Sequence, residues 1–247
     1  MIPLYNLKGK VAWITGGKRV GIKIAETLAQ HGADLIISYN KSKDEAEEAQ
    51  EKARKYGVRT LVIQADVSSR KSVENAITNI KKKFKKIDIL VLMASIFKKM
   101  KLMDVTEKDL IDNFKVHALG TFWPVQLGSS FMPKGGHIIT ISDKTVLGKI
   151  YPDYFPYTVT KGTVAFMTRA LSYELAPKGI FINSIAPGPI LKSEGLSDEE
   201  WKLIRKGSII NYPINDDEAV EEFAKLALYL ATVSSTGFIY PLDFGTL

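Results

Sequence analysis

The sequence predicts a single doubly wound α/β domain over residues 1–247, in which a parallel sheet carries helices on both faces. Short runs rich in β-branched residues alternate with longer amphipathic stretches along the whole chain, and this alternation is typical of βαβ units. Several of the short runs, such as residues 87–93, are almost continuously apolar, as expected of strands that are covered on both faces. The 247 residues are enough to bury a sizeable core, and no linker or repeat divides them.

The predicted elements follow one another in a regular order. Strands are predicted at residues 11–15, 34–39, 60–64, 87–93, 137–142, 181–185 and 238–242. Helices are predicted at residues 22–31, 43–56, 69–84, 107–127, 157–175 and 217–231. The rhythm breaks after residue 187, and we expect residues 191–212 to form a short substrate lid over the carboxyl edge of the sheet, where ligands bind in open α/β folds. A plain surface excursion is the alternative.

The composition excludes several classes of protein. The chain has no cysteine, which rules out disulfides, zinc–thiolate sites and a thiol nucleophile, and its three isolated histidines predict no metal site. The net charge is +7, but no aromatic pattern of the RNA-recognition type accompanies the lysine runs at 81–86 and 98–101, so we expect solvated surface and no nucleic-acid partner. No apolar stretch reaches the length of a membrane span and the first residues lack a signal-peptide pattern. The expectation is a cytoplasmic protein with no membrane partner.

A glycine-rich loop follows the first predicted strand and opens the first predicted helix. Gly16, Gly17 and Gly21 stand in this loop, where glycines permit a tight turn and let the backbone approach a pyrophosphate. The helix start supplies amide donors and the positive end of the helix dipole. The loop therefore predicts a dinucleotide site. The loop residues expected to contact the cofactor are Gly16, Lys18, Arg19, Val20 and Gly21.

The end of the second strand indicates which dinucleotide binds. NAD sites place a carboxylate there to hold the ribose 2′-hydroxyl, but this chain has Tyr39, Asn40, Lys41 and Ser42. Lys41 and the glycine-loop Arg19 are cations suited to a 2′-phosphate, which a carboxylate would repel. We therefore predict NADP(H) as the cofactor, with NAD(H) as the alternative.

A carboxylate also follows the third strand. Asp66 and Val67 stand just past residues 60–64, where Asp66 would lie near the adenine amino group. The alternative for Asp66 is a residue that caps the start of the next helix.

Tyr157 and Lys161 form the candidate proton-transfer pair. A tyrosine and a lysine four residues apart share one face of a helix, and the cation can lower the phenol pKa, which allows the phenol to exchange a proton with a carbonyl or an alcohol. The pair Tyr39 and Lys43 has the same spacing but begins at a strand end. Tyr157 instead opens the helix after the fifth strand, at the predicted cofactor edge.

Taken together, these motifs resemble the short-chain dehydrogenase/reductase family over nearly the whole chain. The matching pieces are residues 15–21, 66–67, Ala94, 141–143, Tyr157 with Lys161, Asn183, Pro187 with Gly188, and 243–245. The resemblance implies a Rossmann fold and an NADP-dependent oxidoreductase, in which Tyr157 donates the proton and Lys161 holds the nicotinamide ribose. It also implies cofactor contacts from Ala94, Ser95, Pro187, Gly188 and Ile190. The long helices imply a homotetramer or homodimer.

The departures from the family pattern point to one branch of it. Asp143 stands where the family has its catalytic serine, Leu92–Ser95 replaces Asn-Asn-Ala-Gly, His117 replaces a helix asparagine, and the glycine loop is one residue short. An aspartate at the serine position, Ala-Ser after strand four and an aromatic residue at Phe97 are similar to the pteridine reductases and dihydrofolate-reducing relatives.

These residues lead to three hypotheses for the function. A protonated Asp143 could hand a proton to a ring nitrogen, whereas a serine hydroxyl suits a ketone. The first hypothesis is an NADPH-dependent reductase of a C=N or C=O group in a small, pterin-like substrate. The second is a 3-oxoacyl-thioester or other carbonyl reductase, and the third is a cofactor-binding regulatory protein that has lost turnover.

The roles of the individual site residues also leave alternatives open. The catalytic set is Asp143, Tyr157, Lys161 and His117, and the substrate set is Ser95, Phe97, Asp143 and Tyr157. Asp143 is alternatively a strand-end carboxylate that pairs with Lys144 or caps a turn. Phe97 either stacks on the substrate ring or lines the pocket wall, and His117 either relays protons or water or fills a helix.

Overall fold

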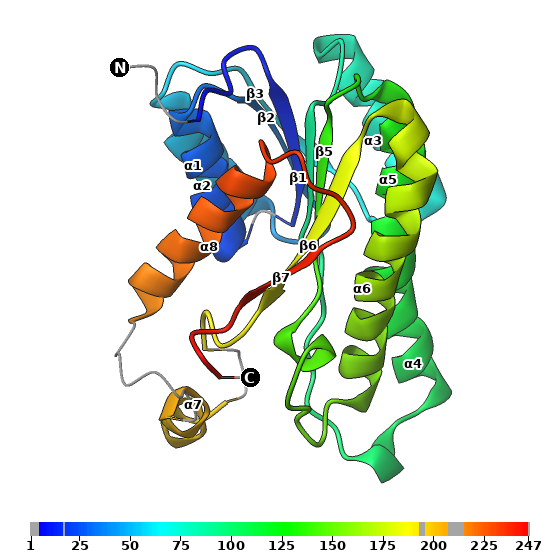
Figure 1. The fold of residues 1–247 in the computed structure, drawn as a ribbon, viewed down its shortest axis with the longest axis vertical. Helices are drawn as coiled ribbons and strands as arrows, with labels where there is room; N and C mark the ends of the chain where they lie inside the picture. Colours follow the sequence, from blue (N-terminus) through cyan, green and yellow to red (C-terminus); the bar gives the residue numbers. More distant parts are fainter. Residues whose placement is uncertain (1–4, 17, 193–195, 207–214, 247) are drawn as a thin grey trace.

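A computed structural model describes residues 5–16, 18–192, 196–206 and 215–246, and it confirms the predicted fold class. The strands are β1 (Val11–Thr15), β2 (Asp34–Tyr39), β3 (Thr60–Gln64), β4 (Ile89–Leu92), β5 (His137–Ile141), β6 (Phe181–Pro187) and β7 (Ile239–Leu242). They form one sheet in the order β3-β2-β1-β4-β5-β6-β7, and every pairing is parallel (Figure 1). The order reverses between β1 and β4, and ligands bind at such a switch point.

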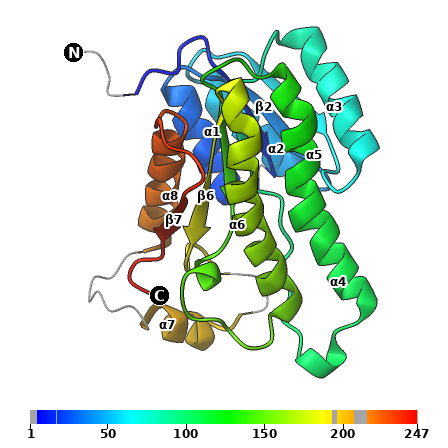
Figure 2. The same cartoon turned by 45° about the vertical axis from the view of Figure 1, so that its right-hand side comes forward.

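Helices cover both faces of the sheet. The helices α1 (Val20–Gln30), α2 (Lys43–Arg54) and α8 (Asp216–Leu230) lie on one face, and α3 (Arg70–Lys83), α4 (Glu107–Phe114), α5 (Gly120–Gly128) and α6 (Phe155–Leu175) lie on the other (Figures 1 and 2). The alternation of side chains in β1 explains the two layers. Ala12 and Ile14 belong to the core under α1 and α8, whereas Val11 and Trp13 belong to the core under α3 and α5.

The helix predicted at 107–127 is interrupted. Residues Lys115–Leu119 form a π-helical turn between α4 and α5, and such turns are frequent at functional sites. Pro124 lies inside α5 and has no N–H to donate to an earlier carbonyl. Gly120 lies so close to the loop after β3 that a Cβ on it would stand 2.9 Å from Val67 Cγ2. The π turn brings His117 into the protein interior.

The predicted lid is described only in part. Residues 193–195 and 207–212 lie outside the described residues, as does Gly17 of the glycine loop. The helix α7 (Asp198–Lys206), within the predicted lid, lies beyond the carboxyl edge of the sheet (Figure 1). No helix within the described part of the chain has both the length and the apolar character required to cross a membrane.

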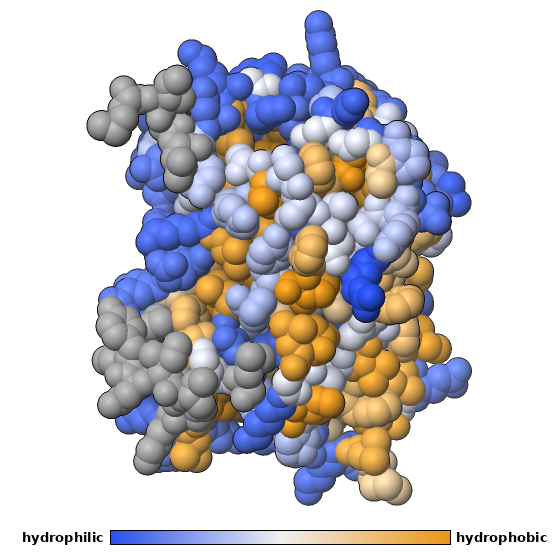
Figure 3. Space-filling model, in the orientation of Figure 1, coloured by the Kyte–Doolittle hydropathy of each residue, from blue (hydrophilic) through white to orange (hydrophobic). Residues whose placement is uncertain are grey.

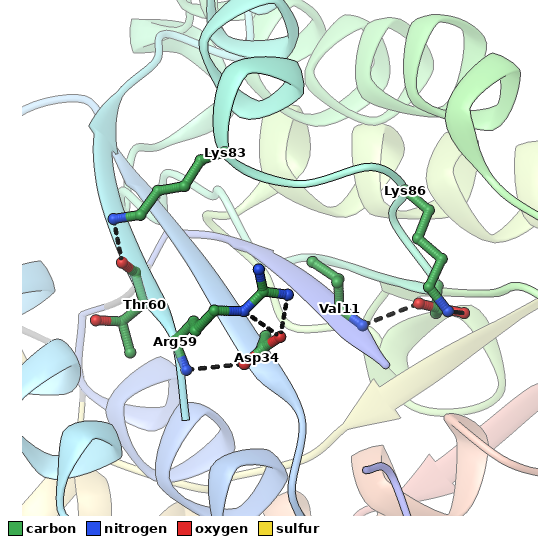
Figure 4. A network of polar contacts seen from close by, with 7 residues as sticks. Val11, Asp34, Arg59, Thr60, Lys83 and Lys86 are labelled. Atoms are coloured by element: carbon green, nitrogen blue, oxygen red, sulfur yellow. Dashed lines mark hydrogen bonds and ion pairs between the residues drawn. The ribbon is translucent and has the colours of Figure 1, made fainter. Parts of the chain in front are cut away.

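Ion pairs hold the amino edge of the sheet, opposite α7. The guanidinium of Arg59 donates to Asp34 at 2.6 Å, and Lys86 Nζ donates to the buried Asp88 at 2.9 Å (Figure 4). Asp88 also accepts the backbone N–H of Val11, which ties β1 to β4. The carboxylates of Asp34 and Asp88 at this edge are thus each paired with a cation.

The strand β7 forms one edge of the sheet and contains a proline. Pro241 pairs with Ala186 of β6 in the parallel register. Its exposed ring has no N–H, which suits only an edge strand.

His137 should make the protein sensitive to acid. Burial, together with Lys10, lowers its pKa from 6.5 to about 4. As the pH falls from 6.5 towards 4, the unfolded chain gains a proton here that the folded chain does not, so the free energy of unfolding decreases. We expect the thermal midpoint of the wild type to fall more than that of His137→Leu between about pH 7 and about pH 5. Circular dichroism melts measure this, and equal falls in both proteins would contradict it.

Candidate active site

A cavity of about 1030 Å³ opens at the carboxyl edge of the sheet. It brings together residues from the glycine loop, the end of β2, the loops after β3 to β6, and the start of α6. Most of the predicted site residues line it: Gly16, Lys18, Arg19, Val20, Tyr39, Asn40, Lys41, Ser42, Asp66, Val67, Ala94, Ser95, Phe97, Asp143, Tyr157, Lys161, Pro187, Gly188 and Ile190. Gly21 and His117 lie behind this wall.

The glycine loop has the shape of a phosphate cradle. Gly16 has a φ of +79°, and a Cβ on Gly21 would stand 2.6 Å from the Gly16 carbonyl oxygen, so α1 can start this close to β1 only with glycine. The first turn of α1 has no side-chain cap and no acidic residue. The N–H groups of Gly21 and Ile22 donate to the carbonyl oxygens of Lys18 and Arg19 at 3.1 Å, so the positive end of the helix dipole is what favours an anion at this side of the cavity.

The end of β2 fits a 2′-phosphate. Lys41 is exposed and forms no ion pair with any of the residues that the structure describes. The neighbouring Ser42 precedes α2 without using its hydroxyl as a cap. Lys18 pairs with Glu45 at 3.6 Å, and the Arg19 guanidinium donates to the carbonyl oxygen of Lys192 at 2.6 Å. In this arrangement Lys41 is the cation available for the phosphate, and Arg19 is bonded to the backbone at Lys192.

Among the described residues, hydrogen bonds reach only one oxygen of the Asp66 carboxylate. Its Oδ1 accepts from the backbone N–H of Ser68 at 2.9 Å and from the Ser68 hydroxyl at 2.7 Å. The cap of α3 is Ser69 rather than Asp66. Oδ2 thus has an acceptor position left at the cavity wall.

Tyr157 and Asp143 form a direct hydrogen bond at the centre of the cavity. Tyr157 lies in the first turn of α6, and its hydroxyl donates to Asp143 Oδ2 at 2.6 Å. The other oxygen of Asp143 accepts the backbone N–H of Thr145 at 2.9 Å. Burial and the nearby Asp143 carboxylate raise the pKa of Tyr157 well above 10. Tyr157 therefore stays protonated, and Asp143 acts as an acceptor on both oxygens.

Lys161 lies one turn after Tyr157 and is almost fully buried. Its Nζ donates to the carbonyl oxygen of Ile141 at 2.7 Å and stands 5.7 Å from the centre of the Tyr157 ring. Burial lowers the pKa of Lys161 from 10.5 to about 8, against a smaller opposing effect of Asp143. The lysine thus carries its charge near neutral pH beside the proton donor.

His117 connects the loop after β4 to α6 from behind the cavity. Its Nε2 accepts from the backbone N–H of Ile96 at 3.2 Å and also contacts the Ser95 hydroxyl at 2.8 Å. We infer that Nδ1 carries the proton and donates to Thr160 Oγ1 at 2.7 Å. Burial, assisted by Lys161, lowers the pKa of His117 to about 2. Both ring nitrogens are therefore engaged, and the ring is neutral.

Aromatic rings form the wall beside the proton donor. Phe97 stacks on Tyr154 with ring centres 4.4 Å apart and meets Tyr157 edge-on at 4.7 Å. An ion pair of 3.2 Å between Lys99 and Glu200 links this wall to α7. The resulting pocket suits a flat ring.

Comparison with known proteins places the chain in a family. The family model described as enoyl-(acyl carrier protein) reductase matches residues 17–245. The chain is a short-chain dehydrogenase/reductase. It is 30% identical to versicolorin reductase 1 of Aspergillus parasiticus over 240 residues, which cover 97% of this chain and 87% of the relative. It is 28% identical to trihydroxynaphthalene reductase of Colletotrichum orbiculare over 220 residues, 89% of this chain and 76% of the relative.

A solved short-chain dehydrogenase from Burkholderia cenocepacia J2315, in complex with NADP, has the same fold. The TM-score is 0.90 at 27% sequence identity, and the match covers 98% of this chain and 99% of the other. The predicted family and fold are thereby confirmed.

The structure also adds residues to this short-chain dehydrogenase/reductase site that the sequence interpretation missed. Thr160 accepts a hydrogen bond from His117, and Tyr154 stacks on Phe97. Lys144 and Trp201 of α7 also line the cavity. The position of Thr160 three residues after Tyr157 could have indicated a place near the catalytic face. Lys144 is not paired with Asp143, because its ammonium points to Thr246 instead.

Proposed function

We propose that this enzyme is an NADPH-dependent carbonyl reductase that acts on a small, flat ring ketone. The observation that carries the proposal is the position of the Tyr157 hydroxyl. It is bonded to Asp143 in the same cavity that the glycine loop lines, and the Tyr157 ring contacts Phe97. A carbonyl oxygen placed there can take the Tyr157 proton as hydride reaches the carbon. Lys161 stabilises the negative charge that then develops on the phenol oxygen.

NADPH supplies the hydride when it is bound. The residues proposed to hold it are the α1 start for the pyrophosphate, Lys41 with Ser42 for the 2′-phosphate, Asp66 for the adenine amino group, and Lys161 for the ribose. Three features support this assignment: the first turn of α1 carries no acidic residue, the Ser42 hydroxyl caps no helix, and Asp66 Oδ2 lies at the cavity wall. The Burkholderia cenocepacia relative in complex with NADP supports it independently.

Asp143 favours reduction of a carbonyl over protonation of a ring nitrogen by its own carboxyl. Both of its oxygens accept hydrogen bonds, from Thr145 and from Tyr157. A carboxylate in this position keeps Tyr157 protonated, as a reductase requires. We propose His117 as a positioning residue, because both of its nitrogens are engaged and burial keeps it neutral.

The flat substrate is supported by the stacked pair of Phe97 and Tyr154. The relatives named versicolorin reductase and trihydroxynaphthalene reductase support a ring substrate through their names. A dihydropterin is the second candidate, favoured by the aromatic ring of Phe97 at the pocket wall.

The test is NADPH oxidation, followed by absorbance, with β-tetralone, dihydrobiopterin and an acetoacetyl thioester as separate substrates. We expect β-tetralone to react fastest. Faster NADPH oxidation with dihydrobiopterin would favour the pterin hypothesis, and faster NADPH oxidation with the thioester would favour an open-chain substrate. NADPH binding without turnover of any of the three would favour a regulatory protein.

We also propose that the enzyme assembles as a homotetramer, with a homodimer as the simpler alternative. Large apolar side chains stand exposed on α4 and α6, including Ile111, Phe114, Phe166 at 69% and Tyr173 at 83% exposure. Figure 3 shows apolar surface gathered around the lower part of α6. Exposed patches of this kind mark protein interfaces. Sedimentation velocity should report four chains, and a monomer would contradict the proposal.

A further inference from the structure

Lys144 directly follows Asp143, yet the proposed reduction gives it no role. Its side chain is buried, with 3% of the residue exposed. The ammonium donates to Thr246 Oγ1 at 2.8 Å and to the Thr246 carbonyl oxygen, and it stands 5.0 Å from the centre of the Tyr151 ring. Burying a cation is costly unless it makes compensating bonds, so this lysine marks a connection that an apolar side chain could not make.

On one side, the connection reaches the loop that carries Asp143. Lys144 begins a short 3₁₀ turn, Lys144–Val146, and Asp143 caps this turn through the Thr145 N–H. The same turn closes with a 3.1 Å bond from the Val146 N–H to the Asp143 carbonyl oxygen. The turn thus sets the direction of the Asp143 carboxylate towards Tyr157.

On the other side, the connection reaches the end of β7. The Thr246 hydroxyl and N–H donate to the Asp243 carbonyl oxygen at 2.6 and 3.1 Å, forming a tight turn. Asp243 packs on Gly188 so closely that a Cβ on this glycine would stand 2.7 Å from Asp243 Cα. The Gly188 N–H also donates to the Leu242 carbonyl oxygen at 2.9 Å. The C-terminal turn therefore supports the backbone of Pro187 and Gly188.

The charges agree with this connection. Asp243 Oδ2 is buried and has no hydrogen-bond partner among the residues that the structure describes. The nearby cation of Lys144 offsets its negative charge, while burial lowers the pKa of Lys144 and Asp243 opposes that shift. Without the lysine, the buried carboxylate of Asp243 would lose its electrostatic partner.

We propose that Lys144 is a positioning residue that fixes the Asp143 loop against the Gly188 backbone. It would fix the distance between the proton donor, Tyr157, and the nicotinamide site, so that both reach the same carbonyl group of the substrate. This inference rests on the proposed reduction, in which proton and hydride reach neighbouring atoms of the substrate. Small displacements of such groups strongly reduce the rate, about 100-fold for 1 Å.

The test compares Lys144→Met with Lys149→Met, an exposed lysine in the same loop. We expect Lys144→Met to lower kcat by about 30- to 100-fold and to change the dissociation constant of NADPH less than about threefold. The deuterium isotope effect with NADPH labelled at the transferred hydrogen should rise, because hydride transfer becomes limiting. Lys149→Met should match the wild type. Thr246→Val keeps the carbonyl acceptor, so its loss of kcat should be smaller but of the same kind.

Two results would overturn the positioning role. One is a kcat for both Lys144→Met and Thr246→Val within about twofold of the wild type. The other is a loss of kcat with no rise in the isotope effect and an equal loss of NADPH affinity, which would indicate general disorder. If Lys144→Met does not fold, Thr246→Val decides alone. Failure of the proposed function is separate, because it would appear as full activity in Tyr157→Phe.

Discussion

Tyr157→Phe is expected to lower kcat by about 10³-fold while NADPH still binds. The substitution removes the hydroxyl that donates to Asp143 at 2.6 Å and keeps the ring that Phe97 contacts edge-on. A positioned general acid contributes roughly 10²- to 10⁴-fold to a rate. Steady-state rates and a fluorescence titration with NADPH measure the two quantities separately.

Tyr154→Phe is the matched control for this prediction. Tyr154 stacks on the same Phe97 ring, but its hydroxyl makes no hydrogen bond with the part of the protein that the structure describes. We expect its kcat to stay within about threefold of the wild type. Equal losses in both variants would show that the effect is not specific to the Tyr157 hydroxyl and would contradict its role as the proton donor.

Asp143→Ser is expected to open the reverse reaction, oxidation of the product alcohol, at lower pH. Alcohol oxidation needs the Tyr157 phenolate as a base, and the Asp143 carboxylate raises the pKa of that phenol. Removing the carboxylate lowers the pKa, so the base form appears at a lower pH. The pH of half-maximal oxidation should fall by about one unit or more. Ketone reduction should stay within about tenfold, because the serine hydroxyl can donate to the carbonyl oxygen.

Asp143→Asn separates charge from shape in this experiment. The amide keeps the size of the side chain and an oxygen that can accept a hydrogen bond from the Tyr157 hydroxyl, but it removes the negative charge. Its oxidation profile should therefore shift in the same direction as that of Asp143→Ser. Profiles that match the wild type in both variants would contradict the electrostatic role of Asp143.

The strands could be predicted from the sequence because their signal is local. β1, β2 and β3 have the predicted bounds, since each is a short apolar run between turn residues. β4 spans Ile89–Leu92 and is shorter than the predicted 87–93; the N–H of Ile87 donates to the Phe131 carbonyl oxygen, outside the sheet. The π turn at Lys115–Leu119 was not predicted. It adjoins Gly120, whose close approach to Val67 joins residues that are far apart in the sequence.

The site shows the same division between local and distant causes. Tyr157 and Lys161 could be paired in advance because one helix turn separates them. Arg19 is predicted to contact the 2′-phosphate, and in the structure its guanidinium donates to the carbonyl oxygen of Lys192, 173 residues away in the sequence. A long, charged side chain reaches many partners, and only the fold decides among them. The bonds from His117 to Ser95 and Thr160 likewise depend on how the loop after β4 meets α6.

Pro241 restricts how copies of this chain can join. An edge strand offers a row of unpaired backbone groups, through which a second sheet can extend the first or an aggregate can grow. Because Pro241 has no N–H to donate, β7 cannot complete a regular ladder with a strand from another molecule. Copies that meet at this edge must therefore pack through side chains. The proline gives protection against uncontrolled sheet extension while leaving the β6 pairing intact.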